Sequence, residues 1–143
     1  MPRARATLWL NHRFRGRRMQ CPKCSNEMTE LPNLPAQALR CTHCNGMWFE
    51  MLAHEQLVPF VQQIDTGSVE QGREYNRIDR IHCPACVGEQ DLIRMVDSKQ
   101  PHIWFESCQS CFGRFYDAGE YTDYTKHSFA EWLEDLDAPA RPL

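Results

Sequence analysis

Four short stretches decide the fold of this chain: Cys21-Pro22-Lys23-Cys24, Cys41-Thr42-His43-Cys44, Cys83-Pro84-Ala85-Cys86 and Cys108-Gln109-Ser110-Cys111. Each stretch is a Cys-x-x-Cys pair. Sixteen residues separate the first two pairs and 21 separate the last two, whereas the interval between Cys44 and Cys83 is longer. The 143-residue chain is therefore an internal repeat of two cysteine-containing units.

Four thiolates from two such pairs form the usual ligand set of a closed structural zinc site. The sequence predicts two Zn²⁺ ions per chain. The predicted metal ligands are Cys21, Cys24, Cys41 and Cys44 at the first site, and Cys83, Cys86, Cys108 and Cys111 at the second. Two other chemistries use the same residue types, because lone Cys-x-x-Cys pairs serve as redox dithiols and iron fits the same tetrahedral sulfur cage. Four pairs in two matched units favour zinc over both.

The turns around the cysteines share a small residue. Two places after the second cysteine of each pair lies Asn26, Gly46, Gly88 or Gly113. These residue types tolerate a left-handed backbone, so we expect that conformation at all four positions. Such tight turns point backbone N–H groups at the sulfurs, and a zinc ion with four thiolates, whose net charge is about −2, needs these donors.

The segments between the cysteine pairs predict a β-hairpin in each unit. In the second unit the expected strands are residues 92–96 and 102–106, while in the first unit only residues 38–40 resemble a returning strand. Each unit then continues with two aromatic residues and an acid, Trp48-Phe49-Glu50 and Phe115-Tyr116-Asp117. This pattern predicts a short third strand leading into a helix N-cap, and Asp117 with Glu120 has the spacing of a capping box.

Three further segments lie outside the hairpins. Residues 51–64 have apolar residues at helical spacing, and Pro59 is expected to split or kink this helix. Residues 69–77 are interpreted as a linker or a solvated helix, and we favour a spacer between the two units. Residues 128–136 predict a second helix, which begins with a Ser128–Glu131 capping box and has one apolar face. We expect that face to pack on the second unit, with docking to another protein as the alternative.

These motifs resemble the bacterial transcription factor IIB-type (TFIIB-type) zinc ribbon family. The family pattern is Cys-Pro-x-Cys, a hairpin, Cys-x-x-Cys-x-Gly-x-Trp, and then an acid before a Gly-Glu-Leu helix. The second unit contains Cys111-Phe112-Gly113-Arg114-Phe115-Tyr116-Asp117-Ala118-Gly119-Glu120-Tyr121, which departs from it mainly at Phe115 and Tyr121, where Trp and Leu are usual. The first unit contains Cys44-Asn45-Gly46-Met47-Trp48-Phe49-Glu50, and its His54-Glu55-Gln56-Leu57 places the Glu two residues late. The resemblance covers about residues 19–60 and 81–125, and it implies two tandem zinc ribbons.

The charge is unevenly distributed along the chain. Residues 1–18 contain six Arg and no acid, which gives +6, whereas the remaining 125 residues contain ten basic and nineteen acidic residues, which gives −9. An acidic body opposes phosphate binding, which needs clustered Lys and Arg. The basic arm is either a contact for nucleic acid or, as we favour, a disordered segment or an artefact of start-site choice, because Met19 lies just before the first cysteine pair.

The sequence also limits location and activity. No apolar run has the roughly 18–20 residues of a membrane span, and the N-terminus lacks the apolar core of a signal peptide. We therefore expect a cytoplasmic protein with reduced thiols. A closed four-cysteine site leaves no coordination position for substrate or water, and no Ser/His/Asp or Cys/His constellation remains once the cysteines bind metal. His43 and His82 are interpreted as surface residues or donors near the sulfurs. The chain is not expected to be an enzyme.

The predicted fold is a small metal-stabilised α+β fold. It comprises two tandem zinc ribbons, each a β-hairpin plus a third strand, with a helical linker and a C-terminal helix. The expected divisions are an arm at 1–18, the first ribbon at 19–60, a linker at 61–80, the second ribbon at 81–125, and an acidic helix and tail at 126–143. The expected function is a non-catalytic interaction module for a protein partner. The alternatives are nucleic-acid binding in a transcription-related role and, less favoured, rubredoxin-like electron transfer through iron.

Overall fold

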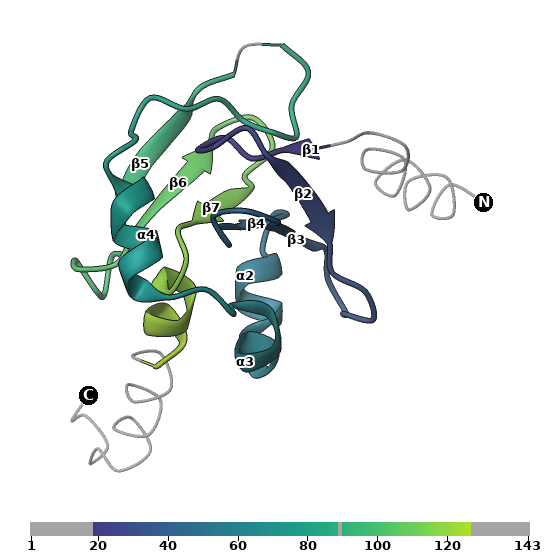
Figure 1. Cartoon of the computed structure of the whole chain (residues 1–143), viewed down its shortest axis with the longest axis vertical. Helices are drawn as coiled ribbons and strands as arrows, with labels where there is room; N and C mark the ends of the chain where they lie inside the picture. The colour runs from purple at the N-terminus through teal and green to yellow at the C-terminus, as the bar shows by residue number, and fades with distance from the viewer. Residues whose placement is uncertain (1–18, 89, 127–143) are drawn as a thin grey trace, which may run out of the picture.

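The computed structural model describes residues 19–88 and 90–126. Strands from both ribbons form one antiparallel sheet in the order β1-β2-β3-β4-β7-β6-β5 (Figure 1). The first ribbon supplies β1 (Met19–Gln20), β2 (Glu27–Glu30), β3 (Ala38–Cys41) and β4 (Met47–Phe49), and the second supplies β5 (Leu92–Val96), β6 (Trp104–Cys108) and β7 (Arg114–Tyr116). Together with the helices, this sheet confirms the predicted small α+β fold. The two predicted hairpins and both third strands are present, although the returning strand expected at 102–106 occurs at 104–108.

The two ribbons join where β4 pairs with β7, and we call this strand pair the seam. Trp48 lies opposite Phe115, and the flanking pairs are Met47 with Tyr116 and Phe49 with Arg114. Trp48 and Phe115 occupy the same place in their own ribbons, four residues after the last cysteine. The seam is therefore a local two-fold axis that relates one ribbon to the other.

Each ribbon inserts its central aromatic ring into the turn of the other. A methyl group added at Gly113 would lie 2.2 Å from Trp48 Cζ2, and one added at Gly46 would lie 2.3 Å from Phe115 Cζ. Because both rings are fully buried, neither has room to move aside. These two glycines are needed for contact between the ribbons.

The expected left-handed conformation lies one residue earlier in three of the four turns. Ser25, Asn45 and Phe112, each directly after the second cysteine, have φ near 60° (65°, 59° and 60°), and only Gly88 fulfils the prediction, with φ 95°. The prediction was thus wrong for Asn26, Gly46 and Gly113. The residue types suggested a need for conformational freedom at these positions. At Gly46 and Gly113 a glycine is instead needed because a side chain would clash with an aromatic ring of the other ribbon.

The sheet has a core on each face. One core contains the cysteines with Trp48, Phe115, Leu39 and Leu92. The other contains Met47, Phe49, Tyr116 and Tyr121, packed beneath the helices. Residues alternate between the two faces along β4 and β7, as the period of a strand requires.

Short helices cover the second core. The helix expected over residues 51–64 occurs as α2 (Ala53–Gln56), the 3-10 turn η1 (Val58–Phe60) and α3 (Val61–Ile64), with the break at Pro59 as predicted. The chain is helical again from 120 to 126, and Figure 1 shows this yellow-green segment beside α2 and α3 below the sheet. The Tyr121 hydroxyl donates to the carbonyl of His54 at 2.7 Å and links these helices. Within residues 19–88 and 90–126, no helix is long and apolar enough to cross a membrane.

The helix at 120–126 is capped by a distant residue. Asp65, directly after α3, accepts hydrogen bonds from Gly119 N at 3.1 Å and Thr122 N at 2.9 Å. Asp117, the predicted capping residue, instead directs its carboxylate to Lys23. The capping-box prediction was therefore wrong, because a buried cation competes for the Asp117 side chain. The N-cap of α2 is Leu52, without a side-chain cap, rather than Glu50.

The segment expected to be a spacer contains α4 (Val69–Asn76), which packs against both ribbons. The Gln71 side chain donates to the His43 carbonyl and accepts from Asn45 Nδ2, both in the first ribbon. Gly72 lies against the backbone of Ala118 in the second ribbon, where an added methyl group would meet the carbonyl oxygen at 2.0 Å. The basic arm at 1–18 and the helix predicted at 128–136 lie outside the described residues.

Replacing Gly113 with Ala should destabilise the zinc-loaded protein by about 2 kcal/mol or more, because the new methyl group overpacks the seam. Equilibrium urea unfolding measures this change. The control is Gly88→Ala, which has open space around it and carries only the conformational cost of about 1 kcal/mol. In a Trp48→Phe background, which removes the clashing ring atoms, the cost of Gly113→Ala should fall by at least about half. An equal cost in both backgrounds would contradict the proposed packing.

Candidate metal centres

The first group of four cysteines gathers at one end of the first ribbon's hairpin. Cys21 and Cys24 lie in the turn between β1 and β2, whereas Cys41 ends β3 and Cys44 lies in the turn that follows it. Their four sulfur atoms all lie within 4.8 Å of one another. Two of the separations are 3.6 Å, between Cys21 and Cys44, and 3.4 Å, between Cys24 and Cys41.

The second group repeats this arrangement in the second ribbon. The Sγ atoms of Cys83 and Cys111 are 3.7 Å apart, as are those of Cys86 and Cys108. Four sulfurs at about 2.3 Å from a tetrahedral zinc ion would be separated by about 3.8 Å. All eight cysteines are free thiols. Both sets of four are therefore compatible with zinc binding, and the two groups are the ones that the sequence spacing predicted.

Backbone amides approach the sulfurs, as the turn geometry predicts. Cys41 Sγ accepts from the N–H groups of His43 and Cys44, each at 3.4 Å. In the second ribbon, Cys108 Sγ accepts from Ser110 N at 3.4 Å and Cys111 N at 3.5 Å. These donors offset the negative charge that four thiolates place on a metal site.

Several of the thiols hold their protons tightly when no metal is bound. Burial raises the pKa of Cys41 and that of Cys86 to about 11. The contact between Cys83 and Cys111 raises the pKa of Cys83 and lowers that of Cys111 to about 5, so this pair shares one proton. The contact with Cys21 likewise raises the pKa of Cys44. At neutral pH, at least two thiols of each site must lose a proton before they can bind metal.

A buried ion cluster, which sequence reasoning missed, lies beside the first site. Lys23, between two metal ligands, is fully buried and contacts Glu106 Oε1 at 2.8 Å and Asp117 Oδ2 at 3.4 Å. It also donates to the Ile78 carbonyl at 2.6 Å. Arg94 adds a second cation, 3.0 Å from Glu106. Burial raises the pKa of Asp117 to about 6. The cluster joins the first ribbon, the segment after α4 and the second ribbon.

One signal in the sequence could have pointed to Lys23. The equivalent position in the second ribbon is Ala85, so the repeat places a charged residue where its counterpart is apolar. Sequence reasoning could not have supplied the partners, because Glu106 and Asp117 lie more than 80 residues further along the chain. Their contact with Lys23 exists only because the seam brings the two ribbons together.

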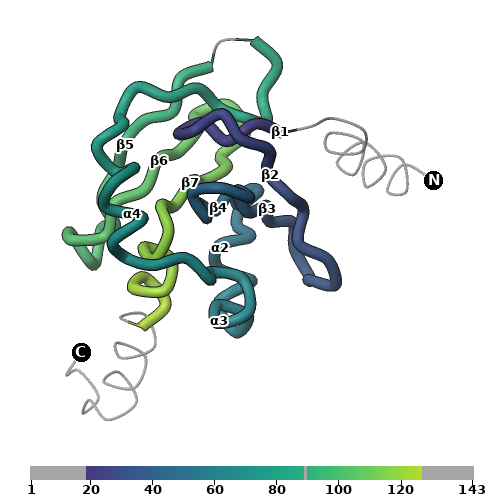
Figure 2. Tube along the Cα trace, in the orientation of Figure 1, coloured from purple at the N-terminus to yellow at the C-terminus, as the bar shows by residue number. Residues whose placement is uncertain are grey.

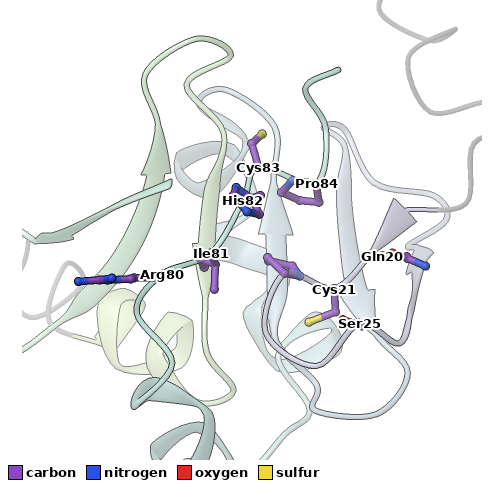
Figure 3. Close-up of a pocket in the computed structure, with 9 residues that line it drawn as sticks. Gln20, Cys21, Ser25, Arg80, Ile81, His82, Cys83 and Pro84 are labelled. Carbon is purple, nitrogen blue, oxygen red and sulfur yellow. The ribbon is translucent and has the colours of Figure 1, made fainter. Parts of the chain in front are cut away.

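A pocket of about 380 Å³ opens between the first cysteine pairs of the two ribbons (Figure 3). Figure 2 shows the purple start of the first ribbon meeting the teal segment that leads into the second. Within the pocket, His82 is exposed and pairs with Asp91 at 2.8 Å. His43 lies outside it and packs edge-on against Tyr75. The residues that line the pocket are Gln20, Cys21, Pro22, Ser25, Arg80, Ile81, His82, Cys83 and Pro84.

The geometry of the first site agrees with a comparison to known families. Residues 20–58 match the transcription factor zinc-finger family, the TFIIB-type zinc ribbon. The match contains all four cysteines of the first site and ends within η1. The match does not extend to the second ribbon. That ribbon resembles the first in its four-cysteine cluster and in the order of its strands. No curated protein and no solved structure matches the chain.

The protein should bind two zinc ions, with an apparent affinity that rises steeply with pH. If two thiols per site release protons on binding, the affinity should fall by about a hundredfold for each pH unit between 8 and 6. Elemental analysis gives the stoichiometry, and competition with a chromophoric chelator at pH 6, 7 and 8 gives the affinity. One zinc per chain, tightly bound iron, or an affinity that does not change with pH would contradict this description of the sites.

Proposed function

We propose that this protein is a zinc-stabilised, non-catalytic interaction module whose partner is another protein. The observation that carries the proposal is the combination of closed metal sites with large apolar side chains on the surface. Each metal site has four cysteines as ligands. All tetrahedral positions would then be filled by protein, which leaves none for a substrate or an activated water. The metals are expected to stabilise the fold.

The exposed apolar side chains favour binding to a protein. In the second ribbon they include Trp104, Phe112, Met95, Ile93, Val96 and Val87. Single exposed apolar residues are ordinary, but aromatic residues that remain on the surface are enriched at protein interfaces. Phe112 and Trp104 are candidates for the large anchors that dominate binding energy in such interfaces.

The acidic sequence after the arm opposes the alternative of nucleic-acid binding. Residues 19–143 carry a net charge of −9, and each filled zinc site would add about −2. Two of the cations that the ribbons supply, Lys23 and Arg94, form ion pairs with Glu106. A surface that binds phosphates needs clustered, accessible Lys and Arg.

Capture of partners from the native cell tests the protein-binding role. A tagged, zinc-loaded chain is crosslinked in cells, purified with and without nuclease treatment, and compared with the Cys21→Ser/Cys83→Ser variant by quantitative mass spectrometry. Proteins that bind the folded module should stay enriched after nuclease and be lost from the variant. Enrichment that disappears with nuclease would overturn the proposal in favour of nucleic-acid binding.

Removal of residues 1–18 should leave a protein that does not bind nucleic acid. Fluorescence anisotropy with labelled single- and double-stranded DNA and RNA, at 50 and 200 mM salt, measures this directly. The full chain serves as the control, because its arm carries six Arg. Binding by the shortened chain that weakens with salt would show that the ribbons themselves contact phosphates.

A further inference from the structure

Because a two-fold axis relates the two ribbons at the seam, the residues at one end of the seam can be compared with their equivalents at the other end. Residues just before β4 and just after β7 lie at one end, and residues just before β7 and just after β4 lie at the other. Equivalent positions follow from the distance to Cys44 or Cys111, the last cysteine of each ribbon. Asn45 corresponds to Phe112, Met51 to Ala118, and Leu52 to Gly119.

One end of the seam is covered by α4 and the glycine before it, and we call it the covered end. Methyl groups added at Gly67 would lie 2.6 Å from Ala118 Cβ and 2.7 Å from Asn45 Cβ. One added at Gly119 would lie 2.9 Å from Val69 Cγ2. The helix therefore sits directly on Asn45, Ala118 and Gly119, which come from both ribbons. Small side chains at these positions permit this close approach.

The other end of the seam has large apolar residues at the same three positions, and we call it the open end. Phe112, Met51 and Leu52 are 58%, 55% and 50% exposed. They correspond to the positions that α4 covers at the opposite end. The repeat thus produces two equivalent surfaces, of which one is occupied by a helix and the other faces solvent.

The backbone at the open end carries a conformational cost that the covered end avoids. Next to the seam, each ribbon has two residues in the left-handed conformation, one before its last strand and one after it. At the covered end these are Asn45 (φ 59°) and Gly119 (φ 85°), which are residue types that tolerate it. At the open end they are Phe112 (φ 60°) and Leu52 (φ 65°). Bulky residues rarely adopt this conformation, and strain of this kind concentrates at functional sites.

We propose that the open end of the seam, formed by Phe112, Met51 and Leu52, is the docking site for an amphipathic helix of a partner protein. The inference rests on the proposed function and names its binding surface. A helix is the occupant that the covered end already accepts. Large apolar side chains fit the apolar face of such a helix, as in other helix-in-groove interfaces. The −9 charge of residues 19–143 favours basic residues on its remaining surface.

Residues 136–143, at the position in the second ribbon equivalent to α4, do not have the sequence of a second such helix. α4 begins 25 residues after Cys44, and the same distance after Cys111 is residue 136. Residues 136–143 contain Pro139 and Pro142, which are incompatible with the interior of a helix of that length. We therefore assign the site to a helix of another protein, and deletion of residues 128–143 tests the predicted helix at 128–136 as the other occupant.

A defined probe tests the surface without knowledge of the partner. The full-length, zinc-loaded chain is titrated with an 18-residue amphipathic Leu/Lys peptide and with a scrambled peptide of the same composition. The amphipathic peptide should bind at least about tenfold more tightly, with NMR shifts at Phe112, Met51 and Leu52. Equal binding of the two peptides would overturn the helical occupant, because charge alone would then explain it.

The matched variant replaces the open-end residues with those of the covered end: Phe112→Asn, Met51→Ala and Leu52→Gly. Peptide affinity should fall at least about tenfold, while the melting temperature stays at or above that of wild type because strain is relieved. The control variant Val69→Thr, in α4 at the covered end of the seam, should bind as wild type does. Unchanged affinity in the triple variant, or a lower melting temperature, would overturn the proposal.

Three further outcomes would assign the site to another occupant or separate failure of the docking site from failure of the proposed function. A dimer that sedimentation detects in wild type, and that the triple variant abolishes, would assign the site to a second copy. Peptide affinity that rises at least about tenfold on deletion of residues 128–143 would assign it to the chain's own C-terminal segment. Either result overturns a partner helix. Nuclease-resistant capture that persists in the triple variant overturns the docking site alone, whereas absence of such capture in wild type overturns the proposed function as well.

Discussion

The pairing of β4 with β7 is the interaction on which the rest of this structure depends. A single zinc ribbon of about 40 residues has too little interior to fold without metal. Here each ribbon gains additional core by placing one aromatic ring, Trp48 or Phe115, against a glycine of the other. Both rings are completely buried. The seam turns two marginal modules into one seven-stranded sheet with a continuous core on each face.

The seam also creates contacts that neither ribbon has alone. Lys23 of the first ribbon is buried against Glu106 and Asp117 of the second, and Asp65 caps a helix of the second ribbon from the end of α3. Removing one partner from a buried ion cluster leaves an uncompensated charge, which is costly. These contacts therefore make the relative position of the ribbons specific. The same specificity places Phe112 and Leu52 at one end of the seam and α4 at the other.

The sequence was sufficient to predict those features of the fold and of the metal sites that depend on a local pattern of residues. Cysteine spacing predicted both metal-ligand sets, and the alternation and turn residues predicted β5 and the short strands β4 and β7. Prediction failed where a distant part of the chain decides the outcome. Gly46 and Gly113 were assigned a backbone role because the rings that approach them belong to the other ribbon. Asp117 was assigned a capping role because Lys23, its partner, lies more than 90 residues away. The linker at 61–80 was expected to be helical, but the packing of α4 could not be predicted, because it requires both ribbons to be in place.

The central claim is that the seam couples the two metal sites, and the zinc affinity of the first site in a Cys83→Ser variant tests it most directly. This substitution removes a ligand of the second site and leaves the first site's four cysteines unchanged. If the ribbons fold as one unit, the first site should lose at least about tenfold in zinc affinity, because its ribbon loses the core at the seam. Hydrogen exchange in β3 and β4 should rise in parallel. An unchanged affinity at the first site, with β3 still protected, would show that the ribbons fold independently and would contradict the account.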